Sequence, residues 1–287
     1  MIVDIHTHVF DPNRHFGAHL QADLQRCQVD PVSWGDVAPR HLETTADADV
    51  AIVFGLQAQA TGWNIPNDWV AAHVAKAPDR LLFFAAIDPL AADYMGELER
   101  CHQELGAVGV KLSPLYQGVH PRDERYCDIY RYCQRHGLPI LFHVGTSFVS
   151  GVPLDYSRPI HYDAIAIDFP ELHMVLAHLG HPWEAETIAV IRRNANVYSD
   201  ISALHYRPWQ FYNAMRLAVE YGVTHKILFG SDFPFTTTAA SITGMRQLND
   251  IPSAAGLPTI PGDAIEEIIH RDSLALLGLA TPTPSNI

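Results

Sequence analysis

Short apolar runs, each followed by a more polar segment, recur along this chain of 287 residues. Each run is almost continuously apolar, which is typical of strands that are buried on both faces. From the second run on, the spacing is roughly 25–35 residues, enough for a strand, a loop and a crossover helix. The eight runs are Ile2–Thr7, Val50–Gly55, Leu81–Asp88, Val108–Ser113, Pro139–Val144, His173–His178, Val197–Ile201 and Lys226–Ser231.

Helix-like segments separate several of these runs. Eight alternations in this length predict an α/β fold, a closed (β/α)8 barrel of the TIM-barrel type, with an open doubly wound sheet as the alternative. No Gly-x-Gly-x-x-Gly follows the first run, so a dinucleotide-binding fold gains no support. We predict one barrel domain over residues 1–280 and a loose tail over residues 281–287. The helix-like segments are Tyr94–Leu105, Asp123–His136, Trp183–Asn194 and Pro208–Tyr221.

Two connections are unusually long, Val9–Arg40 and Gly145–His161. Both follow the carboxyl end of a predicted strand, which is the face where barrel enzymes build their sites. Long loops there often form lids or substrate walls, although a structural plug over the barrel mouth is equally compatible with the sequence.

Composition narrows the classes of partner. The formal net charge of −13 argues against nucleic acid or an anionic membrane surface as a partner. No apolar run approaches the ~18–20 residues of a membrane span. The first strand begins at Ile2, which leaves no room for a signal peptide, and the four cysteines show no Cys-x-x-Cys spacing. We therefore expect a cytoplasmic protein without disulfides, and base rates alone suggest a homodimer.

Two histidines, His6 and His8, end the first run. Side chains at i and i+2 of a strand point to the same face, so both imidazoles can reach one metal ion at ~2.0–2.1 Å. The chain has 17 histidines, and about one His-x-His pair is expected by chance, so this pair alone is a weak motif.

Later runs strengthen the motif, because several of them end in polar residues that a barrel would bring to one mouth. His143 ends the fifth run, His178 ends the sixth, and Asp232 follows the eighth. Lys111 lies among apolar neighbours in the fourth run, where a charged side chain is unfavourable unless it is paired or chemically changed. Singly, each could be a rim, capping or packing residue; together they favour a metal site.

These motifs together resemble the amidohydrolase superfamily, and within it the amidohydrolase-2 branch. That branch includes hydrolases, lactonases and the decarboxylases related to aminocarboxymuconate-semialdehyde decarboxylase. The likeness spans about Ile2 to Leu279. The motifs are His6-x-His8, Lys111 in Gly-Val-Lys-Leu-Ser-Pro, His143, His178 in Ala-His-Leu-Gly, and Asp232 in Phe-Gly-Ser-Asp-Phe-Pro.

The resemblance implies one divalent ion, with zinc as the expected metal. It also implies that His178 contacts the substrate or the metal-bound water. In the alternative, Lys111 is carbamylated and bridges two metal ions, as in other members of the superfamily. The implied ligands of the single ion are His6, His8, His143 and Asp232.

The activity expected first is hydrolysis of a small amide, lactone or ester by a metal-activated water, with Asp232 moving the proton. The alternative is decarboxylation of a small unsaturated or aromatic acid at the same site, for which Arg158 and Arg207 are candidate cationic contacts. A second alternative is a barrel that binds a ligand without catalysis. Three further residues are candidates for lining a small-molecule pocket: Tyr116, Trp183 and His205.

Overall fold

The computed structural model describes residues 1–29 and 35–282. Eight parallel strands form one sheet in the order β1-β2-β5-β6-β7-β8-β9-β10. Each predicted run overlaps one of them, so the eight predicted strands are confirmed. The strands are β1 (Val3–His8), β2 (Val50–Phe54), β5 (Leu81–Ala86), β6 (Gly109–Leu112), β7 (Ile140–Phe142), β8 (Met174–Leu176), β9 (Val197–Asp200) and β10 (Ile227–Leu228).

Backbone hydrogen bonds join the first strand to the chain at and beyond the last one. They close the sheet into a barrel, which confirms the (β/α)8 prediction over the open sheet. The bonds run from Ile5 N to Phe229 O (3.1 Å), from His8 N to Phe233 O (2.9 Å) and from Asp232 N to His6 O (2.8 Å).

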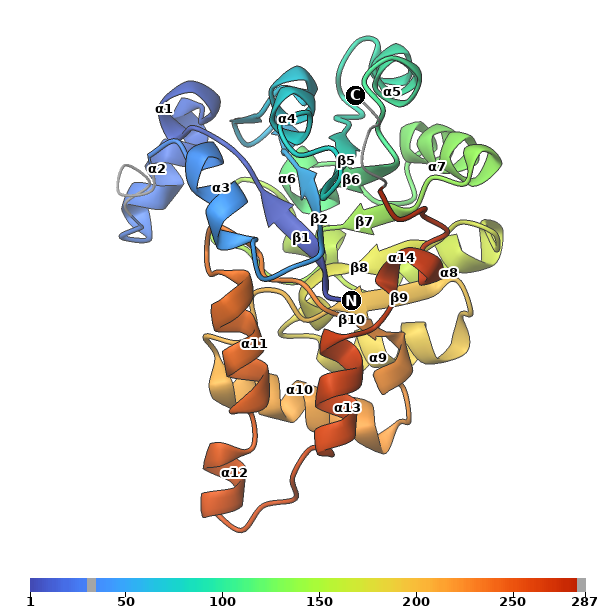
Figure 1. The fold of residues 1–287 in the computed structure, drawn as a ribbon. Helices are drawn as coiled ribbons and strands as arrows, with labels where there is room; N and C mark the ends of the chain where they lie inside the picture. The colour runs from blue at the N-terminus through green and yellow to red at the C-terminus, as the bar shows by residue number, and fades with distance from the viewer. Residues whose placement is uncertain (30–34, 283–287) are drawn as a thin grey trace.

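Helices surround the barrel, with α1 to α3 gathered on one side and α10 to α13 on another (Figure 1). The four predicted helices are confirmed as α5, α7, α9 and α10. The helices are α1 (Pro12–His15), α2 (Ala18–Arg26), α3 (Ala38–Thr44), α4 (Asn67–Val74), α5 (Tyr94–Gln103), α6 (Pro114–Gln117), α7 (Glu124–His136), α8 (His161–Asp168), α9 (Glu184–Arg193), α10 (Pro208–Glu220), α11 (Thr238–Arg246), α12 (Asp250–Ala254), α13 (Gly262–Ile269) and α14 (Ser273–Leu276).

Smaller elements complete the connections. A short hairpin, β3 (Gln57–Ala58) and β4 (Trp63–Asn64), follows β2. The described residues also form the 3₁₀ turns η2 (Leu154–Ser157), η3 (Ala177–Gly180) and η4 (Thr224–Lys226).

The two long connections pack against each other. The first contains α1 and α2, and the second contains η2. Asp23 of α2 accepts a hydrogen bond from Ser150 N at 2.7 Å, and Arg26 Nη2 donates to Phe148 O at 2.7 Å. The carboxylate of Asp23 thereby ties the two connections into one wall beside the barrel mouth. Trp34, also in the first connection, lies outside the described residues.

Three further sequence predictions can be compared with the structure. All four cysteines are free thiols in the structure. Across the described residues, no helix has the length and apolar character needed to cross a bilayer. Residues 283–287 of the predicted tail lie outside the described residues, so the division at residue 280 stays a prediction.

Candidate metal centre

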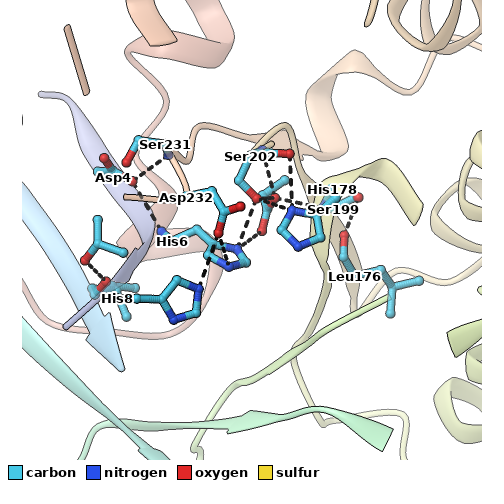
Figure 2. A network of polar contacts seen from close by, with 12 residues as sticks. Asp4, His6, His8, Leu176, His178, Ser199, Ser202, Ser231 and Asp232 are labelled. Carbon is cyan, nitrogen blue, oxygen red and sulfur yellow. Dashed lines mark hydrogen bonds and ion pairs between the residues drawn. The ribbon is translucent and has the colours of Figure 1, made fainter. Parts of the chain in front are cut away.

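His6 and His8 on β1 and Asp232 after β10 converge at the barrel mouth (Figure 2). The Nε2 atoms of both imidazoles lie 3.3 Å from Asp232 Oδ1. All three residues are buried, and the i, i+2 spacing in β1 places the two rings on one face, as predicted.

Asp232 is held in an uncommon backbone conformation, with a φ of 66°. Left-handed values are unfavourable for residues other than glycine and persist where the surrounding structure imposes them. A second buried carboxylate, Asp4, supplies part of that structure. It accepts hydrogen bonds from Ser231 N at 2.9 Å and from Thr238 Oγ1 at 2.8 Å, which anchors the residue before Asp232 to β1.

His178 follows β8 and has the same left-handed backbone, with a φ of 61°. Its ring centroid lies 4.8 Å from that of His6. Among the described residues, ligand atoms of His6, His178 and Asp232 all lie within 4.8 Å of one another. The structure therefore brings His178 into the compact cluster, where the sequence predicted a contact to the substrate or the bound water.

His143 and Lys111 lie next to this cluster on the cavity wall. The ring of His143 is 5.3 Å from that of His178 and 4.5 Å from that of Tyr116. His143 Nε2 and Lys111 Nζ are both buried without a hydrogen-bond partner among the described residues. Lys111 Nζ lies 4.7 Å from the centre of the Phe54 ring. Two unpaired polar atoms of this kind are unfavourable unless a ligand or ion satisfies them.

Burial governs the ionisation of the imidazoles. Removal from water lowers the pKa of each well below the usual 6.5, and neighbouring histidines or Lys111 lower it further. All four are therefore neutral near pH 7 and able to bind a metal ion through a ring nitrogen. These residues are His6, His8, His143 and His178.

The carboxylate and the amine of the site respond to burial in opposite directions. Burial raises the pKa of Asp232 well above its usual value, although Lys111 opposes the shift. Burial lowers the pKa of Lys111 to about 7, opposed by Asp200 and Asp232. The ionised Asp232 is thus poorly compensated by the protein alone, and a bound cation would stabilise it.

The contacts of Asp232 with His6 and with His8 fit a divalent ion. Donors bound to one tetrahedral ion at ~2.0–2.2 Å lie roughly 3.3–3.5 Å apart, and Asp232 Oδ1 is 3.3 Å from each of two imidazole nitrogens. Imidazole and carboxylate are the donors of catalytic zinc sites. The unpartnered Nε2 of His143 is a further available donor.

A cavity of about 550 Å³ opens above these residues. Val29 from the first long connection and Ser147 from the second both line it, so the two connections form part of its wall. Apart from the residues of the candidate metal site, the described lining includes five aromatic side chains and one guanidinium, together with aliphatic, hydroxyl and imidazole groups. The aromatic residues and the arginine are Trp63, Tyr116, Phe148, Tyr206, Phe235 and Arg207.

Of the five predicted substrate contacts, Tyr116 and Arg207 line this cavity, and the other three do not. Arg158 forms an ion pair with Glu186 and lies 5.8 Å from the centre of the Trp183 ring. His205 lines a separate surface cavity and contacts Ser241 Oγ at 3.4 Å. The loops carry these side chains away from the metal cluster.

Sequence reasoning missed Asp200, Ser202, His181 and Tyr206. Asp200 is fully buried and contacts His6 Nδ1 at 2.9 Å. A carboxylate at the end of an apolar strand was the available signal, the same signal that identified the histidines after the neighbouring strands. His181 lines the cavity beside Arg207, and burial lowers its pKa to about 4.

The chain matches the model of the amidohydrolase family over residues 3–279. No match was found among curated proteins. Solved structures match over nearly the whole chain. An uncharacterised TIM-barrel protein from Bordetella bronchiseptica is 22% identical, with a TM-score of 0.69 over 96% of this chain and 99% of that one.

Two further matches carry a named activity. A probable 2-pyrone-4,6-dicarboxylic acid hydrolase from Acinetobacter baumannii, with citric acid bound, is 17% identical (TM-score 0.64; 97% and 99% covered). The 5-carboxyvanillate decarboxylase of Sphingomonas paucimobilis is 14% identical (TM-score 0.67; 97% and 99% covered). Other matching structures hold zinc or manganese. At these identities the likeness shows the shared barrel fold.

Proposed function

The chain belongs to the amidohydrolase family, and we propose that it is a metal-dependent decarboxylase of a small planar carboxylic acid. One observation carries the proposal: a single cavity joins the buried histidine–aspartate cluster to the guanidinium of Arg207 and a set of aromatic rings. The same site would also suit hydrolysis, which is the second candidate below.

The proposed cofactor is one divalent ion held by His6, His8, His143 and Asp232. His178 lies close enough to replace His143 in that set. Imidazole-rich donor sets favour zinc, whereas manganese prefers oxygen donors. When bound, the ion would act as a Lewis acid that polarises a substrate oxygen. Two equivalents of metal, or a carbamate on Lys111, would instead indicate the binuclear alternative.

The substrate class follows from the cavity walls. Arg207 is the one guanidinium among the described residues that line the cavity, and it can bind a carboxylate through charge-assisted hydrogen bonds. Its guanidinium lies 4.4 Å from the centre of the Tyr206 ring, which limits its freedom to turn away. Trp63 and Tyr116, whose ring centroids are 5.8 Å apart, offer faces for a flat conjugated molecule.

Decarboxylation needs a proton donor beside the reacting carbon. The bond between that carbon and the carboxylate breaks, carbon dioxide leaves, and the electron pair left on carbon takes up a proton. Asp232 can relay that proton, because a carboxylate that binds the ion through one oxygen keeps its second oxygen free to take up a proton from solvent and pass it to the carbon.

Lys111 favours the second candidate, hydrolysis of a lactone or ester. Its pKa near 7 and its unpartnered Nζ would allow it to protonate an alkoxide leaving group at neutral pH. Decarboxylation has no such leaving group, so the products separate the two reactions.

The test is to incubate metal-loaded protein with 5-carboxyvanillate, 2,6-dihydroxybenzoate and 2-pyrone-4,6-dicarboxylate and to measure carbon dioxide and ring-opened product. We expect carbon dioxide from at least one aromatic acid. Arg207→Gln should raise KM about 10–100-fold, since a hydrogen bond to a charged group contributes ~1.5–3 kcal/mol, with kcat little changed.

Arg158→Gln is the matched control, because Arg158 does not line the cavity, and it should behave as the wild type. Ring opening without carbon dioxide would replace decarboxylation by the second candidate. Equal turnover by the wild type and Arg207→Gln would exclude Arg207 as the carboxylate contact.

A further inference from the structure

Behind two of the clustered imidazoles lies a buried pair of polar residues, Asp200 at the end of β9 and Ser202 two residues later. Ser202 Oγ lies 3.1 Å from His6 Nδ1 and 2.7 Å from His178 Nδ1 (Figure 2). Asp200 and Ser202 are both inaccessible to solvent. Both contacts are with Nδ1, which in His6 is the nitrogen opposite the one that approaches Asp232, so the pair can determine which nitrogen of each ring carries the proton.

The two oxygens of Asp200 have different partners. Oδ1 accepts hydrogen bonds from His178 N at 2.9 Å, from Ser202 N at 3.0 Å and from the Ser202 hydroxyl. Oδ2 faces His6 Nδ1 at 2.9 Å. Because a carboxylate can only accept, this contact places the proton of the neutral His6 ring on Nδ1.

Ser202 acts on His178 in the same way. The hydroxyl proton of Ser202 is donated to Asp200, so Ser202 Oγ is left with lone pairs toward His178 Nδ1. The second neighbour of that nitrogen is the Ser202 carbonyl oxygen at 3.2 Å, which is also an acceptor only. Both contacts are satisfied when the proton of His178 is on Nδ1.

We propose that Asp200 and Ser202 are positioning residues that fix His6 and His178 in the Nδ1–H tautomer, so that both Nε2 lone pairs face the cluster. For His6, this lone pair faces Asp232 Oδ1 at 3.3 Å, an arrangement that a cation between the two atoms would stabilise. Partners behind a metal-binding imidazole typically contribute a 10–100-fold increase in metal affinity.

The substitution Asp200→Asn tests the assignment because its geometry is constrained. Three donors converge on Oδ1, so the amide oxygen of asparagine must occupy that position. The amide NH₂ then replaces Oδ2 and donates to His6 Nδ1. This reverses the tautomer of His6 to Nε2–H and leaves the Ser202 contacts of His178 in place.

The measurement is the ring-nitrogen chemical shifts of ¹⁵N-histidine-labelled, metal-free protein above pH 7. The signals are assigned by their loss in His6→Gln and His178→Gln. We expect Nδ1–H for both rings in the wild type. We expect Nε2–H for His6 alone in Asp200→Asn, with zinc affinity about 10–100-fold weaker by chelator competition.

Asp4→Asn is the matched control. It removes another buried carboxylate near the site, but Asp4 contacts backbone and hydroxyl groups and no imidazole ring. Its His6 tautomer should therefore be that of the wild type. If the His6 tautomer is also reversed in Asp4→Asn, the proposal is overturned, because the loss of a buried negative charge would then explain the effect.

The proposal refines the metal site of the proposed function, but its primary readout requires neither metal nor substrate. An Nε2–H signal for either ring in the wild type would overturn it, even if Asp200→Asn fails to fold. The expected tautomers in a protein that binds no metal would support the assignment of Asp200 while removing the proposed function.

Discussion

Gly230 packs directly against the backbone that carries His6, and Gly230→Ala is the perturbation that tests whether His6 is rigidly placed. A Cβ at position 230 would lie 2.9 Å from His6 Cβ and 3.5 Å from Ser202 Cβ. Contacts below 3.0 Å between such atoms do not persist, so His6 or its strand must move by several tenths of an ångström. Neither Cβ is the end of a flexible side chain, so the strain cannot be relieved locally.

Two consequences can be measured. Overpacking of a buried site costs about 1–3 kcal/mol, and this should appear in urea unfolding of the metal-free protein. Displacement of His6 from its 2.9 Å contact with Asp200 and its 3.3 Å approach to Asp232 should also weaken zinc binding roughly 10–100-fold.

Gly262→Ala is the matched control, because a Cβ there meets nothing within 4 Å at the exposed start of α13. It should leave zinc affinity unchanged and raise stability by about 0.4–1 kcal/mol. Wild-type stability and zinc affinity in Gly230→Ala would refute the argument that His6 is held in place by close packing.

Asp232→Asn should retain some metal through its amide oxygen but reduce turnover by about 10²-fold or more, measured at confirmed metal occupancy. Near-wild-type turnover would contradict proton transfer by the Asp232 carboxylate. His41 is fully buried, and burial lowers its pKa to about 3, so between pH 3 and 6.5 the unfolded chain binds more protons at this position. The free energy of unfolding should therefore fall as pH decreases below 6.5, by up to ~1.4 kcal/mol per pH unit for this group. Burial raises the pKa of Asp4 to about 6, so between pH 3.8 and 6 this group raises the free energy of unfolding as pH decreases. His41→Gln should make the free energy of unfolding, measured by urea titration, fall less steeply with decreasing pH.

The fold was predictable because its strands are buried on both faces, which produces uninterrupted apolar runs. The predicted boundaries were least accurate at the last strand, where Lys226–Ser231 was expected and β10 spans only Ile227–Leu228. Beyond Leu228 the backbone forms irregularly spaced hydrogen bonds with β1 and no regular parallel ladder. No periodicity in the sequence marks that departure.

The cluster of histidines and Asp232 was predictable from strand ends, but the residues behind it were missed. Asp200 carried the same signal as His143 and His178, yet it lay within a run interpreted as apolar. Ser202 gave no signal, because a serine acquires its role only from the two rings that it touches.

The cavity walls were predictable only in part. Tyr116 lies in α6, the short helix after β6, and Arg207 directly precedes α10; both line the cavity. Arg158 and His205 depend on how their loops turn, and the sequence does not encode that direction in any local pattern. The choice between hydrolysis and decarboxylation depends on the same walls, which explains why it could not be made from motifs.

The most direct test of the account is the metal content of protein purified without added metal and after zinc reconstitution, for the wild type and for His6→Ala/His8→Ala. We predict one equivalent of tightly bound divalent metal in the wild type and none in the double variant. Equal binding by both proteins, or no binding by the wild type at micromolar zinc, would contradict a metal centre built on His6, His8 and Asp232.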